Sequence, residues 1–175
     1  MPTYIIGQRS IQIFAKMNIE SILAPERTFA NLESTSKKRV IELASGILAG
    51  AEPGISQQHL YSKLIAREKI GPTAIGNGIA IPHCRVECSK TFAALFKLSR
   101  GIDFGAIDEI PVRVVFAVIA PQNEANTHLE ILAMLASKFG SPVFFEAVLG
   151  AETDLELYKT AILNLDECRR PNIAG

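Results

Sequence analysis

Three things are scarce in this chain: net charge, long apolar runs and cysteine. The 175 residues include 18 lysines and arginines against 18 aspartates and glutamates, a formal net charge of +0. That balance provides no global attraction to nucleic acid or to an anionic membrane surface, so we expect no nucleic-acid partner. No stretch approaches the roughly 20 apolar residues that a membrane-spanning helix requires, so we also expect no membrane insertion.

The three cysteines are Cys84, Cys88 and Cys168. An odd number, in a sequence whose start lacks an apolar signal segment and a small-residue cleavage site, is typical of reduced thiols and predicts a cytoplasmic location. Regular patterning begins at Met17. We expect residues 1–16 to be an N-terminal extension, either a poorly ordered tail or the product of an upstream start. Residues 17–166 should form one domain and residues 167–175 a C-terminal tail.

Nearly half of the chain, 48%, is hydrophobic, which is enough for a sizeable core. Apolar periodicity and capping residues predict helices and strands in alternation, which is typical of a single α/β domain. The expected helices span 36–50, 56–68, 126–139, 142–149 and 154–165, and the expected strands span 79–81, 91–98 and 112–120. Gly50 and Ser56 are expected as caps of the first two helices, and Asn126 or Thr127 as the cap of the third.

The most specialised local sequence is Ile-Gly-Asn-Gly-Ile-Ala-Ile-Pro-His, which ends at His83. Glycines permit unusual backbone geometry and close approach, while Pro82 fixes its own φ and favours an extended Ile81. The pattern predicts a histidine held at the end of a short strand by a stiff backbone. Such an imidazole could be a nucleophile, a general base or a metal ligand.

Other residues could support a nucleophilic histidine that carries a phosphoryl group. Arg67, at the end of a predicted helix, offers a guanidinium that suits phosphate, and Thr73 offers a hydroxyl. His128 opens a predicted helix, where backbone N–H groups also favour an anion. Backbone amides near Gly76 and Gly78 are further candidate donors.

Several alternatives carry less weight. Zinc could be bound by His83, Cys84, Cys88 and His128, but their spacing matches no strong zinc pattern and we expect no metal. A catalytic pair of Cys84 with a histidine has no oxyanion site to support it. His59 is interpreted as a surface residue. Gly-Asn-Gly is neither a Walker loop nor a dinucleotide fingerprint, so no cofactor is expected.

Taken in order, Arg67-Glu68, Thr73, the run that ends at His83, and Asn-Thr-His-Leu around His128 resemble the type-2 (mannitol/fructose-class) enzyme IIA family of the bacterial phosphotransferase system. The resemblance covers roughly residues 17–165 and is greatest to the free-standing nitrogen-regulatory branch. It implies a mixed β-sheet flanked by helices on both sides. Many relatives have glycine where this chain has Cys84, a small residue that should not prevent phosphorylation.

The resemblance also implies a reaction. His83 would be phosphorylated at its tele (Nε2) nitrogen by an HPr-like phosphocarrier, which an enzyme I-type phosphoenolpyruvate kinase charges. His128 and Arg67 would line that site, with Thr73 nearby. A phosphohistidine keeps a high transfer potential, so positioning and charge stabilisation should do most of the catalysis.

The fate of the phosphoryl group remains open at this point. A length filled by the IIA-like region favours a regulatory output, in which the phosphorylation state controls binding to targets such as sensor kinases or transporters in nitrogen, carbon or potassium regulation. The alternative is a sugar-uptake component that passes phosphate to a separate IIB–IIC permease. A third hypothesis is an interaction module that has lost phosphorylation, against which intact His83, His128 and Arg67 argue.

Overall fold

The computed structural model describes residues 18–163, which fold around a six-stranded mixed sheet. The strand order is β1-β5-β6-β3-β2. β3 pairs with residues 114–115 of β6, and β4 pairs with residues 118–121 further along the same strand. β5 and β6 are antiparallel, whereas β1 is parallel to β5 and both β3 and β4 are parallel to β6. The strands are β1 (Thr28–Leu32), β2 (Ala74–Gly76), β3 (Ile79–Ala80), β4 (His83–Val86), β5 (Phe92–Ile102) and β6 (Val112–Pro121).

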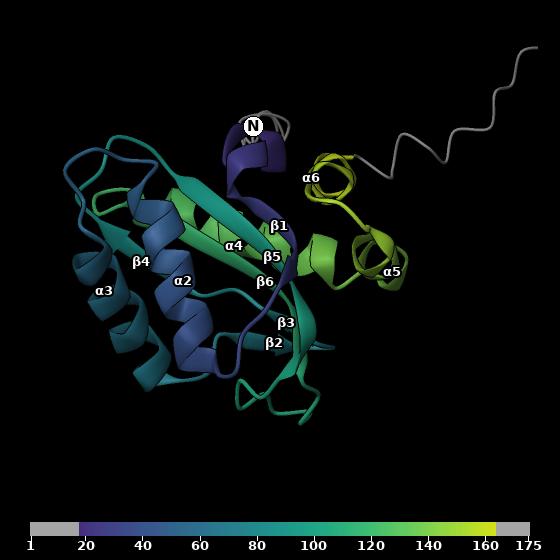
Figure 1. Cartoon of the computed structure of the whole chain (residues 1–175). Helices are drawn as coiled ribbons and strands as arrows, with labels where there is room; N and C mark the ends of the chain where they lie inside the picture. The colour runs from purple at the N-terminus through teal and green to yellow at the C-terminus, as the bar shows by residue number, and fades with distance from the viewer. Residues whose placement is uncertain (1–17, 164–175) are drawn as a thin grey trace, which may run out of the picture.

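Helices cover both faces of the sheet (Figure 1). One face carries α2 (Lys37–Ala49) and α3 (Gln57–Ile70). The other carries α4 (Ala125–Phe139), α5 (Pro142–Gly150) and α6 (Asp154–Ile162). Two short 3₁₀ turns, η1 (Ile19–Ser21) and η2 (Pro25–Arg27), precede β1. This arrangement confirms the α/β class and the mixed sheet between two helical layers.

The central strand β6 has a nearly continuous apolar sequence because its two faces pack against two different hydrophobic cores. Val114, Phe116 and Val118 pack with the α4–α6 layer, and the alternate residues Val115, Ala117 and Ile119 pack with the α2–α3 layer. Successive side chains of a strand point to opposite faces, so residues 114–120, which are buried on both sides, are all apolar, whereas Arg113 is only half-buried.

The expected helices over 36–50 and 56–68 are present, with Gly50 as a C-cap and the Ser36 and Ser56 side chains as N-caps. The predicted cap of the third helix is wrong. α4 begins at Ala125, one residue before Asn126, and Glu124 precedes it without a side-chain cap. The helix is instead stabilised by its contacts with the core of the sheet, which outweigh a single cap.

Two strand predictions also need correction. The strand expected over 91–98 is longer than predicted and continues to Ile102, so that Gly101 lies within β5. His83 does not follow the end of β3 but begins β4. Pro82 separates the two strands because it lacks an N–H for the ladder, although its carbonyl accepts a bond from Val118 N at 2.9 Å.

The predicted extension (residues 1–16) and tail (residues 167–175) lie outside the described residues. Within 18–163, no single helix is long and apolar enough to cross a membrane. α4 and α5 satisfy that length and composition only when taken together, and they are bent by 80° relative to each other.

Candidate functional site

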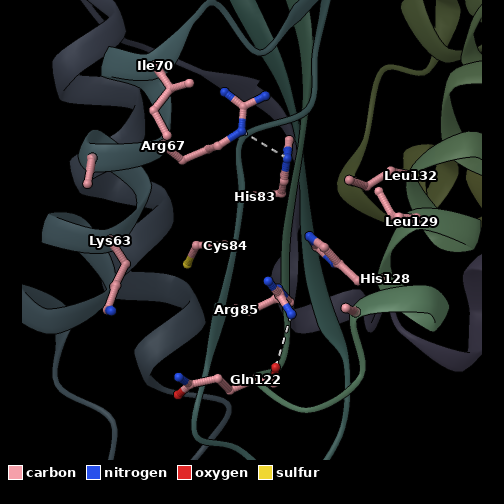
Figure 2. Close-up of a pocket in the computed structure, with 12 residues that line it drawn as sticks. Lys63, Arg67, Ile70, His83, Cys84, Arg85, Gln122, His128, Leu129 and Leu132 are labelled. Atoms are coloured by element: carbon pink, nitrogen blue, oxygen red, sulfur yellow. Dashed lines mark hydrogen bonds between the residues drawn. The ribbon is translucent and has the colours of Figure 1, made fainter.

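His83 has a different hydrogen-bond partner on each ring nitrogen. Its Nδ1 lies 2.7 Å from the carbonyl oxygen of Ile81. A carbonyl can only accept, so we assign the ring proton to Nδ1 and a lone pair to Nε2. That lone pair accepts a bond from Arg67 Nε at 3.2 Å, as Figure 2 shows. The ring is therefore held as the tautomer whose Nε2 is the nucleophilic atom.

Arg67 reaches the site from the last turn of α3. Its Nη1 also donates to the carbonyl of Gly71 at 3.0 Å, which fixes the guanidinium at two points. A guanidinium offers several donors in one plane and matches the geometry of phosphate oxygens. Arg67 can thus hold the lone pair of His83 in the free protein and donate to phosphoryl oxygens when that lone pair is used.

His128 enters from α4, on the opposite side of the sheet from α3 (Figure 2). Its ring centroid lies 5.3 Å from that of His83, with the planes inclined by 53°. The side chain is only 6% exposed, and its Nδ1 is buried without a hydrogen-bond partner in the part of the chain that the structure describes. Unpaired buried polar atoms are uncommon and often occur at functional sites.

Burial and neighbouring charges keep both imidazoles neutral. Burial lowers the pKa of His83, and the hydrogen bond to Ile81 and the charge of Glu68 oppose this effect while Arg67 adds to it. Burial lowers the pKa of His128 to about 4, with smaller contributions from His83 and Arg85. A neutral imidazole is the form that can attack an electrophile.

A cavity of about 530 Å³ surrounds the two histidines. Three cationic side chains line it, Lys63, Arg67 and Arg85, and no carboxylate lies among the described residues that do so. Ile70 and Leu129, which are 84% and 64% exposed, form an apolar rim together with Leu132. The pocket thus favours an anion at its base and an apolar protein surface at its mouth.

The sequence interpretation missed Lys63 and Arg85, although simple spacing could have identified both. Arg85 lies two residues after His83 in β4, and alternate residues of a strand share a face. Lys63 lies four residues before Arg67 in α3, the spacing of neighbours on one helix face. In the structure Arg85 Nη1 donates to Gln122 O at 3.1 Å, beside the pocket (Figure 2).

Other predicted candidates lie away from the pocket. The Thr73 hydroxyl is buried and donates to Glu68 Oε2 at 2.5 Å. The glycine-rich turn joins β2 to β3, and the amide of Asn77 donates to Asp108 Oδ2 at 2.7 Å. Positive φ angles at Gly76, Asn77 and Gly78 form this turn. Neither Thr73 nor the turn lines the cavity.

Residues 18–163 contain no group of three or more His, Cys, Asp or Glu side chains arranged to hold a metal ion. Cys84 lines the cavity, where burial raises the pKa of its thiol to about 12. His59 is exposed on α3. The arrangement at His83 therefore differs from that of every other candidate because it combines an oriented nucleophile with nearby cations.

Fold and site together define an α/β protein with a neutral, oriented histidine in a cationic pocket. The family described as "Phosphoenolpyruvate-dependent sugar phosphotransferase system, EIIA 2" matches residues 21–164, and the chain belongs to it. The predicted family is thereby confirmed.

Individual proteins similar to this chain include nitrogen regulatory proteins. A protein named "Nitrogen regulatory protein" from Pseudomonas aeruginosa is 35% identical over 147 residues, which is 83% of this chain and 96% of the relative. The crystal structure of nitrogen regulatory protein IIA-Ntr from Neisseria meningitidis aligns with a TM-score of 0.78 and 31% identity, covering 82% of this chain and 98% of that one. IIA mannitol from Escherichia coli has a TM-score of 0.67 at 23% identity, covers 79% and 97% of the two chains, and shows the shared fold.

Proposed function

We propose that this protein accepts a phosphoryl group on Nε2 of His83 from the phosphohistidine of an HPr-like phosphocarrier, and that its phosphorylation state controls binding to regulatory target proteins. The observation that carries the proposal is the pair of hydrogen bonds on His83. Ile81 O holds the proton on Nδ1, so the lone pair that accepts from Arg67 belongs to Nε2, in the cationic cavity. Membership of the phosphotransferase family supports the same reaction.

The transfer requires no proton to move on this chain. The lone pair of His83 Nε2 attacks phosphorus, a P–N bond forms there, and the P–N bond to the carrier histidine breaks with its electron pair returning to that ring. Nδ1 keeps its proton, and the imidazolium that results is stabilised by the bond to Ile81 O. Arg67 gives up its contact with Nε2 and donates to the phosphoryl oxygens.

The remaining pocket residues have supporting roles in this proposal. His128, whose Nδ1 has no hydrogen-bond partner within residues 18–163, lies close enough to interact with the transferred group. Arg85 and Lys63 increase the positive potential around it. The apolar rim of Ile70, Leu129 and Leu132 gives the carrier a surface to dock on.

The proposed regulatory output rests on the change in charge that phosphorylation would cause in the pocket. The phosphoryl group brings about two negative charges and leaves His83 as an imidazolium, so the site gains a net charge of about −1, which partly offsets the cations that surround His83. The two states would therefore present different potentials to a partner around the same apolar rim. Sensor kinases or transporters are the proposed targets, and the relatives named nitrogen regulatory proteins support this branch over sugar uptake. Phosphoenolpyruvate is a cytoplasmic metabolite, so we propose the cytoplasm as the location.

Intact-mass spectrometry tests the acceptor. The protein is incubated with phosphoenolpyruvate, an enzyme I-type kinase and an HPr-like carrier, and an acid-labile gain of one phosphoryl group is expected. His83→Ala should show no gain, whereas His59→Ala, a matched change at an exposed histidine of α3, should gain as much as wild type. Normal phosphorylation of His83→Ala, or none of wild type with a charged carrier, would refute the proposal.

A further inference from the structure

Glu68 is a buried carboxylate next to the site but outside the cavity lining. It lies in the last turn of α3, directly after Arg67, and is 8% exposed. Its two oxygens accept bonds from the Thr73 amide at 3.2 and 3.3 Å, the Thr73 hydroxyl at 2.5 Å and Lys37 Nζ at 3.3 Å. Every partner is a donor, which is the set that an ionised carboxylate requires.

The turn that Glu68 holds, residues 71–73, is connected to both partners of His83. The carbonyl of Gly71 accepts a bond from Arg67 Nη1 at 3.0 Å, and Arg67 Nε occupies His83 Nε2. The carbonyl of Thr73 accepts a bond from Ile81 N at 3.0 Å, and Ile81 O occupies His83 Nδ1. Two hydrogen-bonded paths therefore run from this turn, one to each nitrogen of the same ring.

We propose that Glu68 is a positioning residue that holds His83 in its reactive tautomer by fixing the 71–73 turn to α3. The carboxylate joins three elements at this point: α3 itself, the turn that precedes β2, and α2 through Lys37. Displacement of the turn would move Arg67 and Ile81 together, so the hydrogen bonds on both ring nitrogens of His83 depend on one side chain. The effect on phosphoryl transfer rests on the proposed function above, whereas the effect on the tautomer does not.

Glutamine is the informative replacement because it keeps the size of glutamate and removes one acceptor. The amide has a single acceptor oxygen, and wherever its NH₂ group is placed it would face a group that can only donate, the Thr73 backbone N–H or Lys37 Nζ. Buried donors left without an acceptor lose much of their stabilisation. Glu42→Gln is the matched control, since Glu42 is exposed on α2 and its carboxylate bonds only to Arg39 among the contacts described.

Two measurements separate positioning from simple stabilisation. The first is the ¹⁵N spectrum of the neutral His83 ring, in which protonated and unprotonated ring nitrogens differ in shift. We expect wild type and Glu42→Gln to show one tautomer with the proton on Nδ1, and Glu68→Gln to show a mixture. The second is phosphoryl acceptance: kcat should fall on the order of 10- to 100-fold in Glu68→Gln with KM for the carrier unchanged, because Glu68 does not line the docking cavity.

Thr73 provides a second test if Glu68→Gln fails to fold. Thr73→Val removes the hydroxyl that donates to Glu68 and keeps the shape, so it should also mix the tautomers and lower kcat. Thr73→Ser keeps the hydroxyl and should restore the wild-type tautomer and rate. Glu68→Gln combined with Thr73→Val should be little slower than the slower single variant, because both act through one contact.

The proposal is overturned if Glu68→Gln or Thr73→Val keeps the single Nδ1–H tautomer, or if Thr73→Ser behaves like Thr73→Val. Failure of wild type to accept phosphate from a charged carrier would refute the proposed function instead. In that case the ¹⁵N spectra alone would still decide whether Glu68 orients His83.

Discussion

The two histidines of the pocket are adjacent but differ in their hydrogen bonding. His83 has a partner on each nitrogen, whereas the buried Nδ1 of His128 has none among the residues described. Burial lowers the pKa of both rings and brings that of His128 to about 4. A ring with an unused nitrogen beside a nucleophile can respond to the charge that the nucleophile acquires, so the free protein has one oriented imidazole and one responsive imidazole.

The lowered pKa of His128 predicts a pH dependence of stability. The unfolded chain takes up a proton at His128 near pH 6.5, whereas the folded protein does so near pH 4. The contribution of this residue to stability is therefore greatest above pH 6.5 and falls as the pH decreases to 4, by about 3 kcal/mol at most. Urea unfolding at pH 7 and pH 4.5 should show a smaller loss in His128→Gln than in wild type.

His59→Gln is the control for this experiment, because its side chain is exposed on α3. It should lose as much stability as wild type between the two pH values. An equal loss in wild type and His128→Gln would mean that His128 is not held neutral in the folded protein.

At the scale of elements, α3, the 71–73 turn and strands β2 to β4 form one continuous segment that delivers Arg67 and His83. In the glycine-rich turn inside it, Gly78 has a clear structural reason to be glycine. Gly78 has a φ of +81°, and a Cβ there would lie 3.3 Å from Pro111 O and 3.4 Å from the Phe145 ring. The sequence motif that identifies the family therefore works here through close packing of backbone against β6 and α5, at a distance from the pocket.

Gly78→Ala should lower stability through both backbone strain and this close approach. Gly54→Ala is the matched control, since Gly54 has a φ of +94° with nothing within 4 Å of the added Cβ. Strain alone costs about 1–2 kcal/mol, and the contact should add about 1 kcal/mol more at Gly78. Urea unfolding of both variants measures the difference, and an equal loss would show that the close approach can relax freely.

Amphipathic helices could be predicted from sequence because their periodicity is local. The helix expected over 36–50 and the core strand expected over 112–120 are both found in the structure. β1 and β4 could not be predicted: they have five and four residues, and their pairing with β5 and β6 is a tertiary contact.

For the site, sequence motifs were enough to identify His83, Arg67 and His128 as candidate residues. The tautomer of His83 and the burial of Glu68 depend on hydrogen bonds that only the folded chain reveals.

At the scale of the whole molecule, overall charge and local charge differ. The formal net charge is +0, yet the cavity is lined by Lys63, Arg67 and Arg85 without a carboxylate among its described lining residues. Such a local field would attract the anionic phosphoryl group of the proposed carrier over short range and is screened by salt.

The rate of phosphoryl acceptance should therefore fall with ionic strength despite the neutral chain. We expect kcat/KM to decrease several-fold between about 50 mM and 500 mM salt, and the slope to be smaller in Arg85→Gln, which removes one cation of the pocket. Arg39→Gln, an exposed change outside the pocket, should keep the wild-type slope. Equal slopes for wild type and Arg85→Gln would show that Arg85 does not contribute to the field.

The proposed reacting groups come from three layers: His83 from the sheet, Arg67 from the helices on one face and His128 from the helices on the other. Within residues 18–163, the two hydrophobic cores that hold those helices against the sheet share no residue. Repacking either core would nonetheless shift one reacting group relative to His83. We therefore expect mutational tolerance in the two cores to be linked through the proposed reaction: a change in one core that shifts its reacting group should reduce the number of changes that the other core accepts.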